Sequence, residues 1–350
     1  MDGDRTEPIR ERVCDAIARN APLAIRGSGS KAFLGNRCEG EPLDLRGHAG
    51  IVSYAPGELV VTARAGTRLA DLETALDANG QMLAFEPPRF GPDATLGGTI
   101  ACALSGPRRA SVGAARDFVL GTRVIDGRGE VLRFGGEVIK NVAGYDVSRL
   151  MTGAFGTLGV LLDVSLRVVP KPRLEATRVL ELDATEALRR VRAWAQRPLP
   201  ISATAIGGGR LHVRLSGAES AVRSAAAEIG GEAGDDGFWR ALREHALDFF
   251  ADDRAIWRLS VAPTSPIAEG AQLIEWHGAQ RWMKTDADAS HLRTLAANAG
   301  GHATLFRATS APADGAFHPL PPALLALHRR LKAELDPHAI FNRGRLHPEL

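Results

Sequence analysis

The stretch that decides the fold is Leu23-Ala24-Ile25-Arg26-Gly27-Ser28-Gly29-Ser30-Lys31. A short apolar segment, typical of a strand, leads into a turn that combines glycines, small hydroxyls and two cations. Successive backbone N–H groups in such a turn form a concave site for an anion, and a pyrophosphate is the usual occupant. The stretch therefore predicts a strand followed by a phosphate-binding loop.

A second Gly-rich stretch, Thr95-Leu96-Gly97-Gly98-Thr99-Ile100-Ala101, continues to Ser105-Gly106-Pro107 and has the same chemistry. Two separated anion sites, or nests, suit the two phosphates and the sugar of one extended dinucleotide. Two further stretches follow, at 140–146 (KNVAGYD) and 153–160 (GAFGTLGV).

The order of these stretches resembles that of the flavoproteins with a vanillyl-alcohol-oxidase (PCMH-type) FAD-binding domain, most nearly the FAD-binding subunits of glycolate oxidases. The resemblance runs from about Pro22 to Pro170, and the closing segment 335–345 is also similar to the family's ending. It implies FAD as the cofactor. It also implies an α+β fold, in which a PCMH-type FAD-binding domain of two α/β lobes carries an α+β cap domain.

The glycine-rich stretches and the resemblance together predict the FAD contacts. They are Arg26, Gly27, Ser28, Gly29, Ser30, Pro87, Thr95, Gly97, Gly98, Thr99, Ser105, Gly106, Gly113, Arg116, Asp117, Lys140, Asn141, Gly159, Val160 and Asn342. Some have a structural alternative: Arg26 as a surface arginine, Arg116 with Asp117 as an ion pair, and Tyr145 beside the ring as a core residue.

The flavin is expected to be non-covalent. Family members that attach FAD through the first loop carry histidine where this chain has Ser30. In addition, no histidine occurs between His48 and His212, so the predicted FAD domain offers almost no imidazole for the bond.

Composition restricts the other possibilities. A chain of 350 residues is long enough for two domains. Its net charge is +2 and its acidic and basic residues are interspersed, so the sequence shows no continuous basic surface for nucleic acid. The acidic start, Met1-Asp2-Gly3-Asp4, is not expected to be a signal peptide, and no apolar run reaches the ~18–20 residues of a membrane span. The chain is expected to be cytoplasmic, with membrane association only through partners.

The three cysteines, Cys14, Cys38 and Cys102, are too few and too scattered for an iron–sulfur cluster or a zinc site. No metal is therefore expected in this chain. A flavin reduced here needs a partner to carry its electrons onward.

The Pro-rich linker at 170–172 and the resemblance together imply three regions: an FAD domain at 1–172 (lobes about 1–55 and 56–172), a cap at 173–312, and a C-terminal segment at 313–350 that packs back on the FAD domain. The predicted helices are 8–19, one capped by Thr67 with leucines 69, 72 and 76 on one face, 218–229, 237–250, 288–299 and 323–334. Leu324, Leu327, Leu331 and Leu335 form the expected apolar stripe of the last helix. The predicted strands are 23–25, 43–45, 51–54, 59–63, 118–125, 131–134, 160–169, 211–215, 256–261, 272–277, 280–285 and 303–307.

Catalytic residues do not follow from the pattern. Oxidation of a 2-hydroxy acid needs a cation for the carboxylate and a base or metal for the hydroxyl proton. The histidine-rich metal motif that relatives acting on D-2-hydroxy acids carry in the cap is absent here. The remaining weak candidates are His302 and Arg307, followed by His277, Arg281 and Lys284.

Three functions stay open at this point. The resemblance favours an FAD subunit of a glycolate oxidase complex, which oxidises glycolate with a homologous FAD subunit and an iron–sulfur subunit as partners. A stand-alone FAD-dependent oxidoreductase is the second. The third is a non-catalytic flavin or structural subunit whose partner holds the active site.

Overall fold

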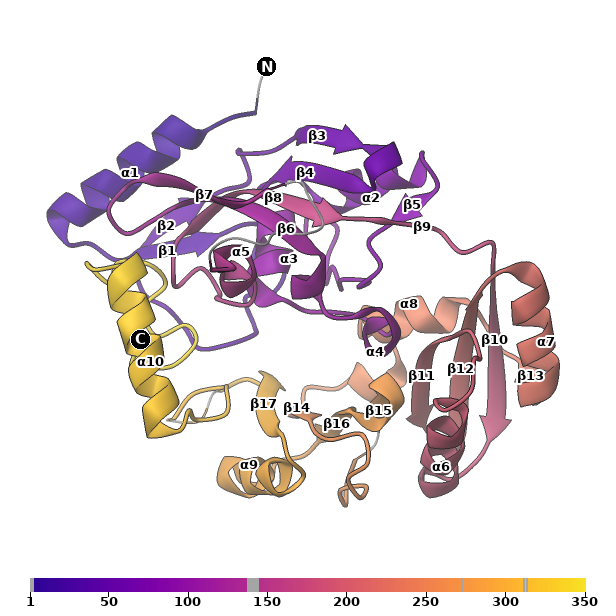
Figure 1. Cartoon of the computed structure of the whole chain (residues 1–350). Helices are drawn as coiled ribbons and strands as arrows, with labels where there is room; N and C mark the ends of the chain where they lie inside the picture. The colour runs from indigo at the N-terminus through magenta and orange to yellow at the C-terminus, as the bar shows by residue number, and fades with distance from the viewer. Residues whose placement is uncertain (1–2, 137–144, 272, 311, 313) are drawn as a thin grey trace.

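The computed structural model describes residues 3–136, 145–271, 273–310, 312 and 314–350, and Figure 1 shows their arrangement. The described residues form two large sheets, one of five strands and one of eight, together with two small two-stranded sheets.

The five-stranded sheet has the order β3-β4-β8-β6-β7, and every neighbouring pair is antiparallel. Its strands are β3 (Ile51–Ala55), β4 (Val60–Arg64), β6 (Val119–Ile125), β7 (Val131–Gly135) and β8 (Val160–Arg167). One face packs against α2 (Leu69–Asp77) and α3 (Leu96–Cys102) in a core that includes Leu72, Ile100 and Val164. Two further short helices, α4 (Arg109–Val112) and α5 (Val147–Met151), lie on the same domain (Figure 1).

The small sheet that carries the first loop is formed by two parallel strands, β1 (Leu23–Arg26) and β2 (Glu41–Asp44). The helix α1 (Thr6–Arg19) covers it with Ile9, Val13 and Ala16, which recur at helical spacing. A second pair, β5 (Gln81–Met82) with β9 (Val169–Pro170), joins the end of α2 to the exit from the domain.

The eight-stranded sheet has the order β13-β10-β12-β11-β15-β16-β14-β17, and all its described pairs are antiparallel. Its strands are β10 (Leu174–Glu181), β11 (Ile201–Gly207), β12 (Arg210–Gly217), β13 (Glu232–Ala233), β14 (Ile256–Ser260), β15 (Leu273–Glu275), β16 (Gln280–Lys284) and β17 (His302–Arg307). Because β14 pairs with β16 and β17, strands that are far apart in the sequence become neighbours.

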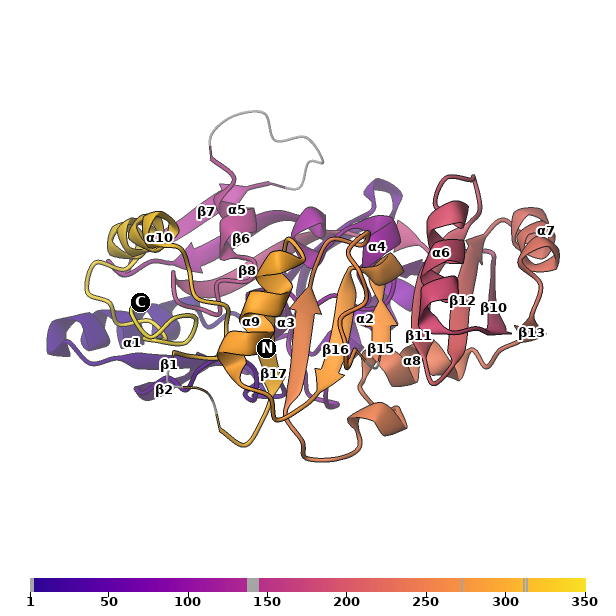
Figure 2. The same ribbon diagram turned by 90° about the horizontal axis from the view of Figure 1, so that it is seen from below.

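The two faces of this sheet differ. The helices α6 (Ala184–Trp194), α7 (Glu219–Ile229) and α9 (Ala289–Asn298) pack on the outer face (Figures 1 and 2). The inner face meets α8 (Gly237–Arg243) and residues of the first domain in a shared core that includes Phe155, Trp282 and Phe306. The cap sheet therefore presents its inner face to the first domain.

The chain ends in α10 (Pro322–Leu335) and a segment that returns to the first domain. The helix is where the pattern predicted it, but the expected stripe is wrong. Leu324 and Leu327 are 41% and 45% exposed, and the side chain that α10 buries is Lys332. An apolar period predicts a buried face only if that face rests on a core, and here it does not.

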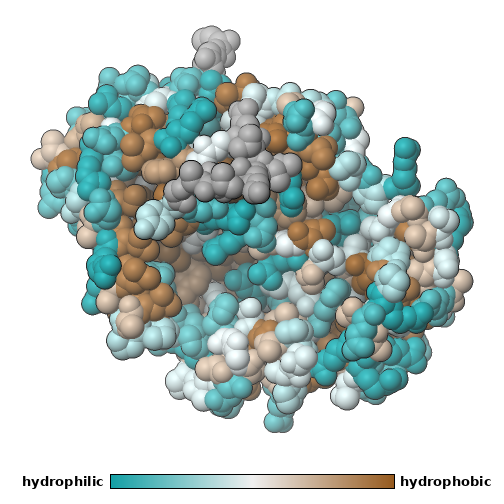
Figure 3. Space-filling view, in the orientation of Figure 1, coloured by the Kyte–Doolittle hydropathy of each residue, from teal (hydrophilic) through white to brown (hydrophobic). Residues whose placement is uncertain are grey.

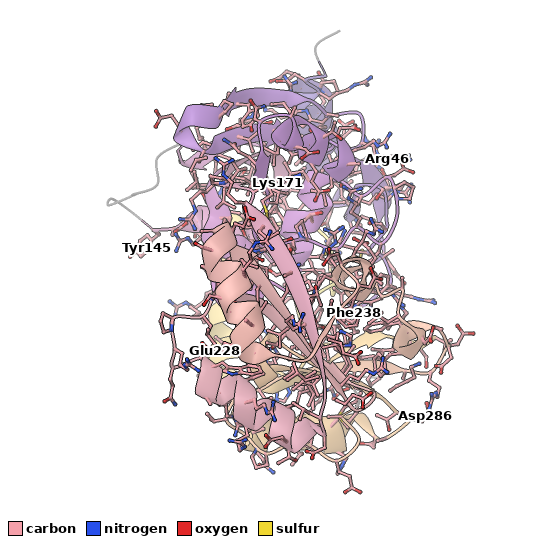
Figure 4. The ribbon with its side chains drawn as sticks, turned by 90° about the vertical axis from the view of Figure 1, so that its right-hand side faces the viewer. Arg46, Tyr145, Lys171, Glu228, Phe238 and Asp286 are labelled. Carbon is pink, nitrogen blue, oxygen red and sulfur yellow. The ribbon has the colours of Figure 1, made fainter. Side chains whose placement is uncertain are left out.

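Three other expectations are corrected. The N-cap of α2 is Arg68 rather than Thr67, whose hydroxyl instead accepts a hydrogen bond from the Gly50 N–H at 2.9 Å. The helix expected at 237–250 stops at Arg243, because His245 has a positive φ of 55°. Of the two alternatives left open for Tyr145, the core residue is excluded, because its side chain is 97% exposed and lies at the rim of the molecule in Figure 4.

The boundaries 1–172, 173–312 and 313–350 stay a prediction. They are consistent with the change from the first domain to the cap sheet close to Lys171, which Figure 4 labels.

Candidate functional site

The first loop leaves β1 at Arg26 and turns at Gly29, which has a φ of +80°. Within the described chain, the N–H groups of Ser28 and Gly29 have no hydrogen-bond acceptor, while the Ser28 hydroxyl accepts a bond from the Ser30 N–H at 3.4 Å. A left-handed residue after free N–H groups is the geometry of an anion nest. The loop therefore offers unpaired donors to a ligand.

The second stretch has a different geometry. Thr95 caps α3 by accepting a hydrogen bond from the Gly98 N–H at 3.3 Å, and the Gly97 N–H is bonded to the Ala65 carbonyl at 2.7 Å. The N–H of Leu96 is bonded to the carbonyl of Thr67. Since these donors are already used, the expectation of a second open nest is corrected. The stretch supplies a tightly packed wall instead.

The two stretches touch. A Cβ added to Gly27 would overlap the Thr95 side chain, so only glycine allows this approach. Gly97 is equally confined, because its Cβ would lie 2.7 Å from the Ala65 Cβ. Gly98 differs from both: its Cβ would meet only the Thr95 hydroxyl, at 3.2 Å. Gly97 is thus needed for packing, whereas Gly98 faces space.

That space is a cavity of about 320 Å³ between the two stretches. Its wall includes Arg26, Gly27, Ser28, Gly29, Ser30, Lys31, Thr95, Gly98, Phe155, Asn342 and Arg345. A smaller cavity of about 60 Å³ extends it and is also lined by Gly97 and Gly159. Ten of the residues predicted from the sequence meet here: Arg26, Gly27, Ser28, Gly29, Ser30, Thr95, Gly97, Gly98, Gly159 and Asn342.

Asn342 closes the cavity from the C-terminal segment. Its amide oxygen accepts a hydrogen bond from the Ile25 N–H at 2.7 Å, and its amide nitrogen donates to the Phe155 carbonyl at 2.7 Å. The backbone joins as well, since the Asn342 N–H donates to the Leu23 carbonyl at 3.0 Å. One side chain thereby fixes the end of β1 against the loop before β8.

A buried ion pair holds this segment in place. The Lys332 ammonium lies 2.6 Å from the Asp336 carboxylate and also donates to the carbonyls of Thr157 and Phe341, at 2.7 and 2.9 Å. The Asp336 carboxylate accepts the N–H groups of Ile340 and Phe341 in return. Burial lowers the pKa of Lys332, and the charge of Asp336 opposes that shift. All three ammonium protons have acceptors, as a buried charge requires.

The other predicted contacts lie elsewhere. Ser105 accepts the Ala115 N–H at 3.0 Å and Asp117 accepts the Ala114 N–H at 2.8 Å, so both brace the turn that contains Gly113. Arg116 donates to the Thr152 carbonyl at 3.4 Å. The buried hydroxyl of Thr99 lacks a partner among the described residues, and Gly106 packs on the Glu86 carbonyl. Val160 lies in the core, and Pro87 also lies outside the cavity wall. Lys140 and Asn141 lie outside the described residues.

The cap is bound to the first domain by a buried charge network. Arg214 of β12 donates to the Glu86 carboxylate at 2.9 Å, and Arg108 donates to Glu86 at 3.3 Å and to Glu175. Burial raises the pKa of Glu86, but Arg214 and Arg108 outweigh that effect, so the net shift is downward. Glu86 is thus held as an anion between two domains.

The weak catalytic candidates outside β17 differ in whether their side chains have bonded partners. Arg281 is fully buried and donates to the carbonyls of Ser265 and Gly278, so it is structural. Lys284 pairs with Asp252 at 3.0 Å. His277 has a positive φ of 56° and a buried ring nitrogen without a partner in the described chain.

His302 and Arg307 belong to β17 at the inner face. The Arg307 guanidinium lies 4.7 Å from the centre of the Phe33 ring, which belongs to the first domain. The pKa of His302 is lowered by burial and by Arg258, a residue of β14 that the sequence pattern did not single out. No local sequence pattern identifies Arg258, because its position beside His302 depends on the pairing of β14 with β17, which is distant in the sequence.

Among the described residues no group of three or more His, Cys, Asp or Glu side chains is arranged to hold a metal ion. In the same part of the chain, no helix combines the length and the apolar character needed to cross a bilayer.

The comparisons with known proteins agree with this geometry. Residues 4–135 match the family described as FAD binding domain. The chain is 48% identical over 349 residues to the glycolate oxidase subunit GlcE of Escherichia coli strain K12, which covers 99% of both chains. It is 33% identical over 175 residues to the glycolate oxidase subunit GlcD of Bacillus subtilis strain 168, covering 49% of this chain and 37% of that one.

Among solved structures, alkyldihydroxyacetonephosphate synthase superposes with a TM-score of 0.66, covering 96% of this chain and 75% of that chain at 16% sequence identity. That likeness shows the fold alone. Together with the near-complete match to GlcE, it means that the protein has a PCMH-type FAD-binding fold and belongs to the family of glycolate oxidase subunit GlcE, an FAD-dependent oxidoreductase family.

Proposed function

We propose that the chain is the FAD-binding subunit of a glycolate oxidase complex, takes part in the oxidation of glycolate to glyoxylate, and passes electrons to an iron–sulfur partner. The observation that carries the proposal is the 48% identity to GlcE over 99% of both chains. A homologous FAD subunit is the second proposed partner, since a relative named GlcD matches 49% of the chain. The proposed location is the cytoplasm.

The residues present fit FAD. The free N–H groups of Ser28 and Gly29 face the same cavity as the cations Arg26 and Arg345, which suits a diphosphate. Gly98 leaves room beside them. Bound FAD supplies the acceptor for the two electrons that leave the substrate. We also propose that the remaining residues predicted from the sequence, including Lys140 and Asn141, contact the same cofactor.

The chain's own residues position and enclose the cofactor. Asn342 locks β1 to the loop at Phe155, so the cavity keeps its shape when the C-terminal segment is in place. The proposed attachment is non-covalent, because the described residues of the cavity wall include Ser30 and no histidine.

The test is to express the chain with and without the other subunits and to measure FAD content and glycolate-dependent dye reduction. The proposal expects FAD in the isolated chain and substantial turnover only in the complex. An isolated chain that turns over as fast as the complex would establish a stand-alone oxidoreductase. A complex that contains FAD in this chain but does not oxidise glycolate would refute the proposed reaction.

A further inference from the structure

The inner face of the cap sheet has an apolar end and a polar end. Strand residues alternate between the faces, so Arg258 shares the inner face with Ile256, which packs in the core between the domains. Arg258 stands opposite Trp282 of β16 and Thr304 of β17 in the register, and His302 is two residues from Thr304 on the same face. The polar end therefore gathers a cation and an imidazole on neighbouring strands.

A second arginine reaches this end from the first domain. Arg109 begins α4, which packs against β11 and the short turn Trp276–Gly278. Its guanidinium lies 4.4 Å from the centre of the Trp276 ring, and the Trp276 indole donates to the Gly106 carbonyl at 3.1 Å. The indole thereby sets the position of Arg109 at the junction of the two domains.

The positive groups affect one another's protonation. Burial lowers the pKa of Arg258 to about 10, and repulsion from Arg109 adds to that shift. The His302 side chain is exposed at the start of β17, and its pKa is lowered by partial desolvation, by Arg258, by His318 and by Arg109. Three groups from α4, β14 and β17 therefore share one electrostatic environment. Two carboxylates oppose these shifts: Glu275 raises the pKa of Arg258, and Asp117 raises the pKa of Arg109.

Within the described chain, neither guanidinium makes a hydrogen bond or an ion pair. The adjacent Arg108 shows the contrast, because it donates to both Glu86 and Glu175. Glu275 makes no hydrogen bond to Arg258 among the described residues. One of its carboxyl oxygens, Oε1, accepts from the Trp282 indole at 2.6 Å and from Gln280 at 2.9 Å. Arg258 nevertheless keeps part of its side chain accessible, because its exposure is intermediate although its neighbours Trp257 and Leu259 are buried. In Figure 3 the molecular face is hollowed between the first domain and the cap.

We propose that Arg258 and Arg109, with His302 beside them, form a binding site for the carboxylate of a small organic acid at the junction of the cap sheet and the first domain. Two guanidinium groups that lie in one environment and lack a bonded partner in the described chain repel each other, and a bound carboxylate offsets that repulsion. A planar guanidinium holds a carboxylate through two parallel hydrogen bonds. The inference rests on the proposed function only in naming a 2-hydroxy acid as the natural occupant.

The test uses oxalate, a small carboxylate that has no hydroxyl to oxidise, and measures its binding to the FAD-loaded full chain by calorimetry. Arg258→Met and Arg109→Met keep side-chain length and remove the charge, while Arg133→Met, an exposed position on β7, is the matched control. Loss of one charge-assisted pair predicts oxalate binding on the order of tenfold to a hundredfold weaker in each of the first two variants and unchanged in the control. Arg258→Lys should lie between, because it keeps charge but not the two-bond geometry.

FAD content, measured for every variant, shows whether the protein remains folded. The site is overturned if folded wild-type protein does not bind oxalate, or if Arg258→Met and Arg109→Met both bind it as tightly as wild type. Equal affinity for inorganic phosphate and oxalate would also overturn it, by reducing the site to a general anion site.

The proposed function can fail separately. A complex that binds oxalate through Arg258 but never oxidises glycolate keeps the site and rejects the function. Glycolate oxidation that is indifferent to both arginine substitutions keeps the function and rejects glycolate as the occupant of this site.

Discussion

Replacement of Gly98 by aspartate separates the ligand site from the fold. The new Cβ would meet only the Thr95 hydroxyl, at 3.2 Å, and a small rotation of that side chain relieves the contact. Gly98 lies in the first turn of α3, where an acidic residue is well tolerated. The variant should therefore fold, with its carboxylate directed at the cavity between the two loops.

The loss of affinity follows from charge. At about 4 Å from a phosphate, with an effective dielectric constant of about 20, a carboxylate is repelled by about 4 kcal/mol. That energy corresponds to roughly a thousandfold weaker FAD binding. Gly98→Ala is the matched control: it adds only a methyl group to the wall and should weaken FAD binding by about tenfold or less.

The assay is a titration of the flavin-free chain with FAD, together with the flavin-to-protein ratio after gel filtration and circular dichroism for the fold. Gly97→Ala provides the opposite case. Its Cβ would lie 2.7 Å from the Ala65 Cβ, so it should lower the free energy of unfolding by about 1–3 kcal/mol. Full flavin content with unchanged affinity in Gly98→Asp would refute the placement of FAD beside this residue.

Three further outcomes are expected. FAD should leave the purified chain on treatment with acid or heat, because Ser30 cannot form the covalent bond, and flavin that stays on the denatured polypeptide would contradict this. Lys332→Met strands the buried Asp336 carboxylate and should cost about 3–5 kcal/mol in urea unfolding, and a loss below about 1 kcal/mol would show that the ion pair is dispensable. Burial raises the pKa of the Glu275 carboxyl from 4.5 to about 7, so the folded protein holds this proton more tightly than the unfolded chain does. The free energy of unfolding is therefore highest below pH 4.5 and falls as the pH rises to about 7. This loss is on the order of 3 kcal/mol, and Glu275→Gln should remove it; equal pH dependence of unfolding in both proteins would reject that assignment.

The first loop shows what local sequence can predict. Strand β1 and the glycine turn after it follow from an apolar triplet and from residues that tolerate a positive φ. The second stretch was predicted as another nest, yet its N–H groups are bonded to Ala65, Thr67 and Thr95. Glycine in the second stretch allows close packing, and the sequence pattern alone does not distinguish this role from that of an anion-binding turn.

The cap shows the limit of such reasoning. Strands β10 and β11 and the helix α6 were not predicted, because the sheet joins segments that are distant in the chain. Arg258 and Arg109 come together through that long-range pairing and through the docking of α4, so no local motif indicates them. The same applies to Asn342, whose contact with Ile25 depends on the returning C-terminal segment.

The central claim is that FAD held by this chain takes part in glycolate oxidation. The most direct measurement compares glycolate-dependent dye reduction by the assembled complex containing either the wild-type chain or Gly98→Asp, after both complexes are shown to contain all their subunits. The account predicts turnover in the wild-type complex and a large loss in the variant, with Gly98→Ala close to wild type. Equal turnover in the wild-type complex and in a Gly98→Asp complex that lacks this chain's FAD would contradict it.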